Sequence, residues 1–165
     1  MVLSVRLLAP EDAGAFQRVR LDALQRYPQS FLTTADEFRA RPIADHEQAL
    51  AAGKSWGVVD EGELVGIAAL LPLPYAAAAH RAEIGAFYVM PENQGTGAAD
   101  ALLSGMMAQA RTVGIWQLEL FVADSNRRAQ RFYARHGFVE QGRLPNAALV
   151  GGVMTSDIFM TADLR

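Results

Sequence analysis

The chain has 165 residues, of which 51% are apolar, and a formal net charge of −3. That length and composition fit one buried core, so we expect a single domain over residues 1–165. The mildly acidic balance argues against a protein that coats nucleic acid. The absence of cysteine excludes disulfides, a thiol nucleophile and cysteine-based metal sites.

The remaining composition favours a soluble chain without metal or membrane. The N-terminus lacks the layout of a signal peptide, and no apolar run reaches the length of a membrane span. The three histidines show no zinc-site spacing. We therefore expect a cytoplasmic protein with no metal, no nucleic-acid partner and no membrane partner. Its alanine- and arginine-rich usage is typical of a bacterial protein.

Hydrophobic periodicity predicts an alternation of strands and helices along the chain. Val2–Leu8 is expected as an edge strand, followed by a helix from Pro10 that ends before Pro28. Further strands are expected at Trp56–Asp60, Glu63–Leu71, Glu83–Val89, Ile115–Val122, Phe138–Glu140 and Asp157–Ala162. Further helices are expected at Ala44–Ala52, from the glycine turn near Gly97 to about Arg111, and after Asn126. Connections are expected at Phe31–Arg41, Pro72–His80 and Pro145–Gly152.

The residues from Gln94 to Asp100 carry a strand through two glycines into a helix. The first N–H groups of a helix have no intrahelical partner, and the helix dipole adds positive charge there. The sequence therefore predicts a phosphate-bearing ligand at this turn, the alternative being a turn that merely starts a helix. A P-loop is excluded because Lys54, the only lysine, lies far away, and a dinucleotide fingerprint lacks its third small residue and its parallel-strand repeat.

A second block follows the strand that ends at Val122. Asp124-Ser125-Asn126 form an N-cap cluster, and the short helix after it carries apolar and aromatic residues on one side. Gly137 stands where a left-handed residue would end that helix, and Phe138 can pack back on it.

The two blocks resemble signatures of one family. Gln94-x-x-Gly97-x-Ala99 resembles the pyrophosphate-binding Q/R-x-x-G-x-G/A motif of the GNAT (general-control-related N-acetyltransferase) superfamily, whose ligand is acetyl-coenzyme A. The stretch from Asn126 to Phe138 is similar to the N-x-x-A-x-x-(L/F)-Y-x-x-x-G-F signature of the same superfamily. The resemblance implies an α+β fold: a central, mostly antiparallel mixed sheet with a bulged, splayed strand pair, flanked by about four helices.

The resemblance also implies how acetyl-coenzyme A is held. Phe87 and Val89 offer their backbone to the pantetheine arm in a wedge that a bulge at Gly85 opens, and the Phe87 N–H polarises the thioester carbonyl. Asn126 caps its helix and touches pantetheine, although the cap alone would explain it. Arg127, Arg128 and Arg131 are candidates for the 3′-phosphate, or a solvated basic face, and Asp100 is expected to point away from the ligand. The pyrophosphate is expected on backbone N–H groups of Gln94, Gly95, Thr96, Gly97, Ala98 and Ala99.

Two side chains are implied in the chemistry. Tyr133 would protonate the leaving thiolate, the alternative being a core tyrosine. Glu83 lies eleven positions before Gln94, the offset of the catalytic glutamate in the histone-acetylating branch, and would be the base, directly or through water; a surface residue without a role is the alternative. His80 is a weaker candidate for the base.

The acceptor would meet Tyr27 and Phe31, in a wall expected to include Pro28, Thr33, Thr34 and the Pro72–His80 and Pro145–Gly152 loops. The resemblance implies an N-acetyltransferase that passes acetyl from acetyl-coenzyme A to a primary amine by direct attack in a ternary complex. A non-catalytic acyl-coenzyme A-binding regulatory module on the same fold is the alternative, and a dinucleotide-binding oxidoreductase is a distant third. The acceptor's identity is not encoded in the motifs. Homodimers are common in the family, so a homodimer is compatible with the resemblance.

Overall fold

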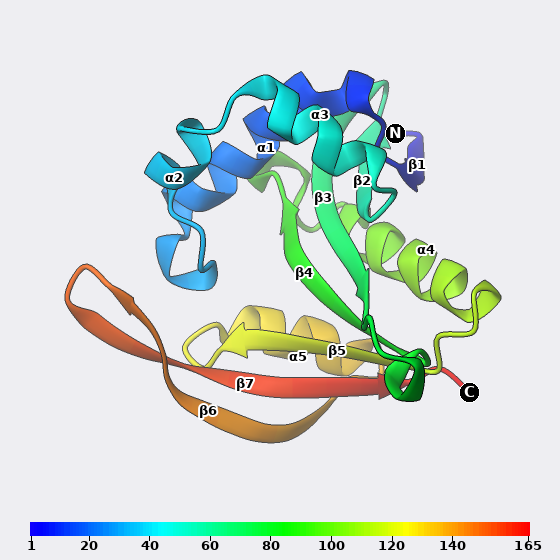
Figure 1. Ribbon diagram of the computed structural model, residues 1–165, viewed down its shortest axis with the longest axis vertical. Helices are drawn as coiled ribbons and strands as arrows, with labels where there is room; N and C mark the ends of the chain where they lie inside the picture. Colours follow the sequence, from blue (N-terminus) through cyan, green and yellow to red (C-terminus); the bar gives the residue numbers. More distant parts are fainter.

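The structure is a computed structural model that describes residues 1–165 (Figure 1). Seven strands form one sheet: β1 (Leu3–Leu7), β2 (Ser55–Asp60), β3 (Glu63–Pro72), β4 (Arg81–Val89), β5 (Gln117–Ala123), β6 (Val139–Val150) and β7 (Val153–Asp163). Five α-helices accompany them: α1 (Ala13–Arg26), α2 (Ala35–Arg39), α3 (Ile43–Ala51), α4 (Ala98–Thr112) and α5 (Arg127–Arg135). None of the helices is long and apolar enough to cross a membrane.

The sheet has the order β1-β2-β3-β4-β5-β7-β6, and only the β4–β5 pair is parallel. Side chains alternate across a strand, so β4 serves two cores. Tyr88 belongs to the core beneath α1, whereas Val89 belongs to the core beneath α4. Helix α5 lies behind β5, and no α-helix covers the opposite face of β5 and β7 (Figure 1). We call this uncovered surface the open face. The expected mostly antiparallel mixed sheet is confirmed.

The predicted splay between β4 and β5 is present. The two strands pair only over Arg81–Glu83 and Gln117–Glu119, and then separate. A bulge in β4 accompanies the splay. Between the pairs Ile67–Tyr88 and Ala69–Gly85, β3 advances by two residues and β4 by three, so β4 carries one extra residue. The residue with the unusual backbone is Ala86, with φ of +52°, and not Gly85, where the sequence predicted it. Gly85 stays paired with Ala69, so the extra residue is taken up one position later.

Two predicted connections are wrong. Phe31–Arg41 contains α2, which begins at a capping box: the Glu37 N–H donates to the Thr34 hydroxyl, and the Glu37 carboxylate accepts from the Thr34 N–H. Pro145–Gly152 is not a long loop, because β6 runs on to Val150 and turns into β7 at Gly151-Gly152. Both glycines have positive φ, as a tight hairpin requires, and Pro145 is tolerated at a register shift on the edge strand.

Candidate active site

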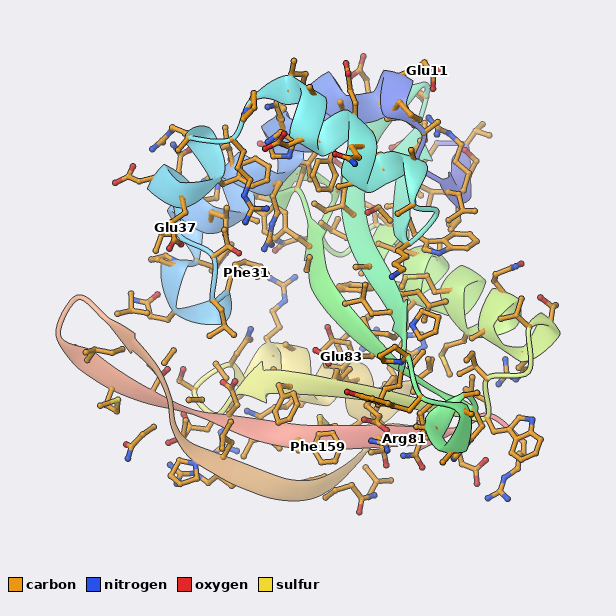
Figure 2. All side chains as sticks on the ribbon, viewed as in Figure 1. Glu11, Phe31, Glu37, Arg81, Glu83 and Phe159 are labelled. Atoms are coloured by element: carbon orange, nitrogen blue, oxygen red, sulfur yellow. The ribbon has the colours of Figure 1, made fainter.

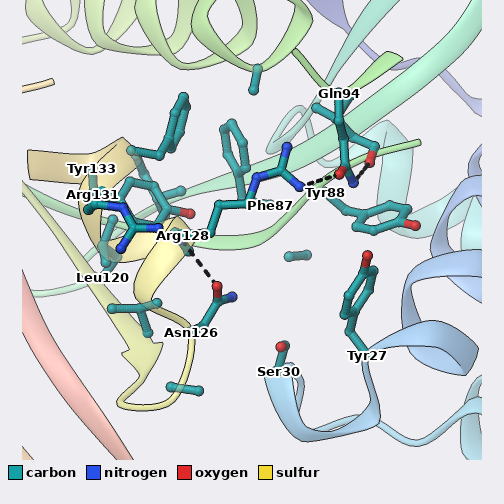
Figure 3. A pocket seen from close by; sticks show the side chains of 18 of the residues that line it. Tyr27, Ser30, Phe87, Tyr88, Gln94, Leu120, Asn126, Arg128, Arg131 and Tyr133 are labelled. Carbon is teal, nitrogen blue, oxygen red and sulfur yellow. Dashed lines mark hydrogen bonds between the residues drawn. The ribbon is translucent and has the colours of Figure 1, made fainter. Parts of the chain in front are cut away.

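A cleft of about 480 Å³ lies where β4 and β5 separate (Figure 3). Its walls are Ile84–Val89 of β4, Leu120–Ala123 of β5, the turn before α4, the inner side of α5, and residues just beyond α1. The volume is within the range of small-molecule sites. Both sequence motifs therefore meet at one cavity.

The turn before α4 offers a row of free backbone donors. No N–H from Gly95 to Asp100 donates to a protein acceptor, and the first helical bond runs from the Ala101 N–H to the Gly97 carbonyl at 2.9 Å. Gly95 and Gly97 have φ of +76° and +93°, a backbone that favours glycine. A Cβ at either glycine would meet no atom within 4 Å, so the space beside this backbone is open. The turn fits a diphosphate.

The Gln94 side chain is part of the scaffold of this turn. Its Nε2 donates to the Val89 carbonyl at 3.0 Å, and its Oε1 accepts from Arg128 Nη1 at 2.7 Å (Figure 3). Its own backbone N–H donates to the Pro91 carbonyl at 3.3 Å, so Gln94 is not one of the free donors. Gln94 thus links the end of β4 to α5 and fixes the position of the turn relative to both.

The backbone of Val89 faces the cleft. The Met90 N–H donates to the Val65 carbonyl of β3 at 2.8 Å, so the backbone N–H and C=O of Met90 point toward β3. Backbone groups alternate in direction along a strand, so those of Val89 point to the other edge, where its carbonyl meets Gln94. Phe87, two residues earlier, also lines the cleft, and its ring packs against Phe132 and Tyr133.

Tyr133 reaches the cleft from α5. Its ring packs against Phe87, Phe132 and Phe138, and the residue is 8% exposed. Its hydroxyl makes no hydrogen bond to the protein, and the side chain lines the cleft (Figure 3). Burial raises the pKa of the phenol above its ordinary value of 10.0, so the hydroxyl keeps its proton at neutral pH. Asn126 caps the helix that carries it, because its Oδ1 accepts from the Ala129 N–H at 3.1 Å.

Helix α5 also supplies the positive charge of the cleft. Arg128 and Arg131 line it, whereas Arg127 donates to Gln130 on the outer side of the helix. Arg135 donates to Asp100 at 2.7 Å, and His136 Nε2 lies 2.8 Å from the same oxygen. Arg135, with His136, holds the pKa of Asp100 below its ordinary value. Asp100 is therefore paired with α5, but both it and Arg135 line the cleft, so its predicted orientation away from the ligand stays a prediction.

Glu83 is separated from the cleft wall. It is the last β4 residue paired with β5, opposite Glu119, and its exposed side chain lies on the open face (Figure 2). Beside it, Arg81 binds Glu119 through a two-bond ion pair, and this arginine lowers the pKa of Glu119. Glu83 itself has no cationic partner in the structure. Glu83 does not itself line the cleft, although it directly precedes Ile84, which does.

The end of the cleft where the sequence predicted the acceptor, which we call the acceptor end, is formed beyond α1. Tyr27, Ser30 and Phe31 line it, and contact of Tyr27 and Phe31 with an acceptor stays a prediction. The Phe31 ring rests on the Arg20 guanidinium, whose carbon lies 4.6 Å from the ring centre, and burial lowers the pKa of Arg20 to about 10. The sequence also placed Pro28, Thr33, Thr34 and the Pro72–His80 and Pro145–Gly152 segments here. None of these residues lines the cleft, and His80 instead packs on Trp116 at the paired end of β4 and β5.

One contact at this end was not predicted. The Tyr88 hydroxyl donates to Asp22 at 2.6 Å, and the rings of Tyr88 and Tyr27 lie 5.9 Å apart. The pair clamps the end of α1 to β4 and so sets the position of Tyr27. The available signal was Asp22 itself, a charged residue next to the helical stripe of Val19 and Ala23 that faces the sheet.

Comparison with known proteins adds independent findings. A family model described as the acetyltransferase (GNAT) family matches residues 18–138. Over 60 residues the chain is 43% identical to an uncharacterized N-acetyltransferase of Mycobacterium tuberculosis strain H37Rv, a segment that spans 36% of this chain and 38% of that protein.

Solved structures of similar fold extend over nearly the whole chain. The acetyltransferase of the GNAT family from Streptococcus pneumoniae gives a TM-score of 0.85 at 19% identity, covering 98% of this chain and 99% of that one. The Salmonella typhimurium protein yncA, solved with its cofactor acetyl-CoA, gives a TM-score of 0.81 at 20% identity. That match covers 100% of this chain and 95% of the yncA chain. At these identities the matches show a shared fold.

Proposed function

The chain belongs to the acetyltransferase (GNAT) family, and on that premise we propose that it is an N-acetyltransferase that moves an acetyl group from acetyl-CoA to a primary amine. One observation carries the proposal: unpaired hydrogen-bond donors and an unpaired proton donor meet at one cleft. The hydrogen-bond donors are the backbone N–H groups from Gly95 to Ala99, and the proton donor is the hydroxyl of Tyr133. When bound, acetyl-CoA supplies an acetyl thioester.

The cosubstrate is held mainly by backbone. The pyrophosphate binds to the backbone N–H groups of Gly95, Thr96, Gly97, Ala98 and Ala99. The side chain of Gln94 holds this turn in place through its hydrogen bonds to Val89 and Arg128. Phe87 and Val89 offer backbone groups to pantetheine, with the Phe87 N–H directed at the thioester carbonyl. Asn126 lines the same arm, and Arg128 and Arg131 attract the phosphates.

Proton movements are assigned to two side chains. Tyr133 gives its proton to the departing thiolate, for which its protonated state is suited, because a phenol of raised pKa is charged only in strong alkali. Glu83 accepts the proton of the substrate ammonium through water at the open face. The amine attacks directly in a ternary complex, with Tyr27 and Phe31 against the acceptor.

A regulatory module that only binds acyl-CoA is the alternative function. A buried phenol that lines the cleft and has no hydrogen-bond partner in the protein is available as a proton donor, so the environment of Tyr133 favours an enzyme. A homodimer and a cytoplasmic location are further parts of the proposal, suggested by the family resemblance and the composition.

The test is acetyl transfer by the purified chain. Acetyl-CoA is mixed with a panel of primary amines, thiol release is followed, and acetylated products are identified by mass spectrometry. We expect acetyl-CoA-dependent product with at least one amine class. Tight binding of acetyl-CoA without product from any amine would favour the regulatory module, and no binding at all would contradict both functions.

A further inference from the structure

The open face carries an exposed aromatic pair beside the cleft. Phe121 of β5 is 49% exposed, lines the cleft, and stands directly across from Phe159 of β7. The two ring centres are 5.0 Å apart with an interplanar angle of 31°. Figure 2 shows Phe159 on this uncovered side of the sheet. The neighbouring residues Leu120 and Ile158 point to the other face and build the core, so the pair is not needed for packing. We call it the Phe121–Phe159 platform.

The charges around the platform are unbalanced. The arginine of this surface, Arg81, is already paired with Glu119, whereas Arg143 is in register with Ile158 and so belongs to the other face, where it pairs with Asp124 at 3.0 Å. Glu83 and Asp157 have no cationic partner. Burial, together with Asp124, raises the pKa of Asp157, which agrees with its lack of a cation.

These two carboxylates flank the platform. Glu83 is in register with Glu119, two residues before Phe121, and Asp157 precedes Phe159 by two residues. Side chains two residues apart share a face of a strand, so one free carboxylate lies beyond each end of the ring pair. An amine is attracted to this surface, whereas the arginines that line the same cleft, Arg128 and Arg131, come from α5 behind β5 and not from the open face.

The surface is also bounded. The short helix η2 (Pro28–Ser30) lies against β5 and β6, and Tyr27 and Phe31 on either side of it line the cleft. The ceiling of the acceptor end is therefore aromatic, like its floor. Such a space suits a small flat molecule more than an extended peptide.

We propose that the acceptor is a small arylalkylamine without a carboxylate, bound with its ring on the Phe121–Phe159 platform and its ammonium toward Glu83. The inference rests on the proposed function. In the reaction the amine nitrogen forms a bond to the acetyl carbon as the carbon–sulfur bond breaks. The ammonium proton leaves through water to Glu83, and the thiolate takes the Tyr133 proton. The second proton that the nitrogen loses on becoming an amide returns the Tyr133 phenolate to a phenol.

The test compares matched acceptors that differ in one group. 2-Phenylethylamine and L-phenylalanine share the ring and the amine, L-phenylalanine amide removes the negative charge, and n-butylamine removes the ring. We expect kcat/KM for phenylethylamine to exceed that for phenylalanine on the order of tenfold or more, with the amide between them. Phenylethylamine should also exceed n-butylamine by roughly tenfold, the worth of an aromatic contact.

Two variants assign the preference to the platform. Phe121→Ala should remove most of the preference for phenylethylamine over n-butylamine while the Kd for acetyl-CoA stays the same. Trp116→Ala is the matched control, because Trp116 is 54% exposed on the segment before β5, also stacks on a ring, and lies outside the cleft. It should leave the preference intact. Asp157→Asn should narrow the discrimination against phenylalanine.

The outcomes separate this inference from the proposed function. Equal or better use of phenylalanine, or a preference that survives Phe121→Ala, would overturn the inference and leave an acetyltransferase. Acetyl-CoA binding without acetylation of any amine, including unrelated polyamines and peptides, would overturn both.

Discussion

Arg128 of α5 donates a 2.7 Å hydrogen bond to the side-chain carbonyl of Gln94, and this contact joins the two sequence motifs. The other end of Gln94 holds the Val89 carbonyl. One amide therefore fixes the strand that would face pantetheine, the turn that would hold pyrophosphate, and the helix that carries Tyr133.

This bridge predicts energetic coupling between the motifs. Gln94→Ala and Arg128→Ala should each weaken acetyl-CoA binding, and the double variant should lose less than the sum. For a partly exposed pair the coupling should be about 0.5–1 kcal/mol in a double-mutant cycle measured by calorimetry. Arg127→Ala is the control partner, because the Arg127 side chain hydrogen-bonds to Gln130 of its own helix and not to Gln94. Coupling of Gln94 to Arg127 as large as to Arg128 would contradict the bridge.

The phosphate turn predicts a sharp effect at Gly97. Gly97→Glu places bulk and negative charge beside the free N–H groups, so acetyl-CoA binding should be lost. Gly114→Glu is the matched control, since Gly114 follows the other end of α4 with φ of +80° and open space around it. Both variants strain a left-handed position by about 1–3 kcal/mol, but only the first should abolish binding in calorimetry. Unchanged affinity in a folded Gly97→Glu protein would place the phosphates elsewhere.

Two buried phenols predict a loss of stability in alkali. Burial raises the pKa of Tyr88, with Asp22 adding to the shift, and burial also raises that of Tyr133. In the unfolded chain both ionise near pH 10, while the folded chain keeps both protons. The folded state then binds more protons above that pH, so stability is full below about pH 10 and falls as pH rises.

Chemical denaturation between neutral pH and pH 11 measures this fall. Tyr88→Phe and Tyr133→Phe should each reduce the slope above pH 10, because each removes one ionising group from the unfolded state. Tyr75→Phe is the control, since Tyr75 is 69% exposed. If neither Tyr88→Phe nor Tyr133→Phe changes the slope of unfolding free energy against pH above pH 10, the alkaline loss of stability comes from other groups.

The sequence predicted those parts of the site that depend on local backbone chemistry. The local sequence identifies Gly97 as a left-handed glycine and Asn126 as an N-cap, because each of these features depends on only a few neighbouring residues. The contact of Gln94 with Arg128 joins residues 34 positions apart and has no local signature.

The errors have the same origin. Pro145 and the Gly151-Gly152 pair read as a loop because proline and glycine disfavour strands, but an edge strand with a register shift accommodates the first and a tight hairpin requires the second. The bulge was assigned to Gly85 from conformational preference, whereas the register with β3 places it at Ala86. Glu83 is a different case: its role as the base stays a prediction, and the motif offset that selects it does not reveal on which face of the sheet its side chain lies.

The central claim is that the cleft carries out acetyl transfer with Tyr133 as proton donor, and Tyr133→Phe tests it most directly. The variant keeps the ring packed against Phe87 and Phe138 and removes only the hydroxyl. The measurement is the single-turnover rate of acetyl transfer to the best acceptor, with the Kd for acetyl-CoA measured alongside. General acid catalysis contributes about 10²–10⁴-fold, so the rate should fall on that order while the Kd stays nearly constant. A folded variant that binds acetyl-CoA normally and transfers acetyl at the wild-type single-turnover rate would contradict the account and leave Tyr133 as a packing residue.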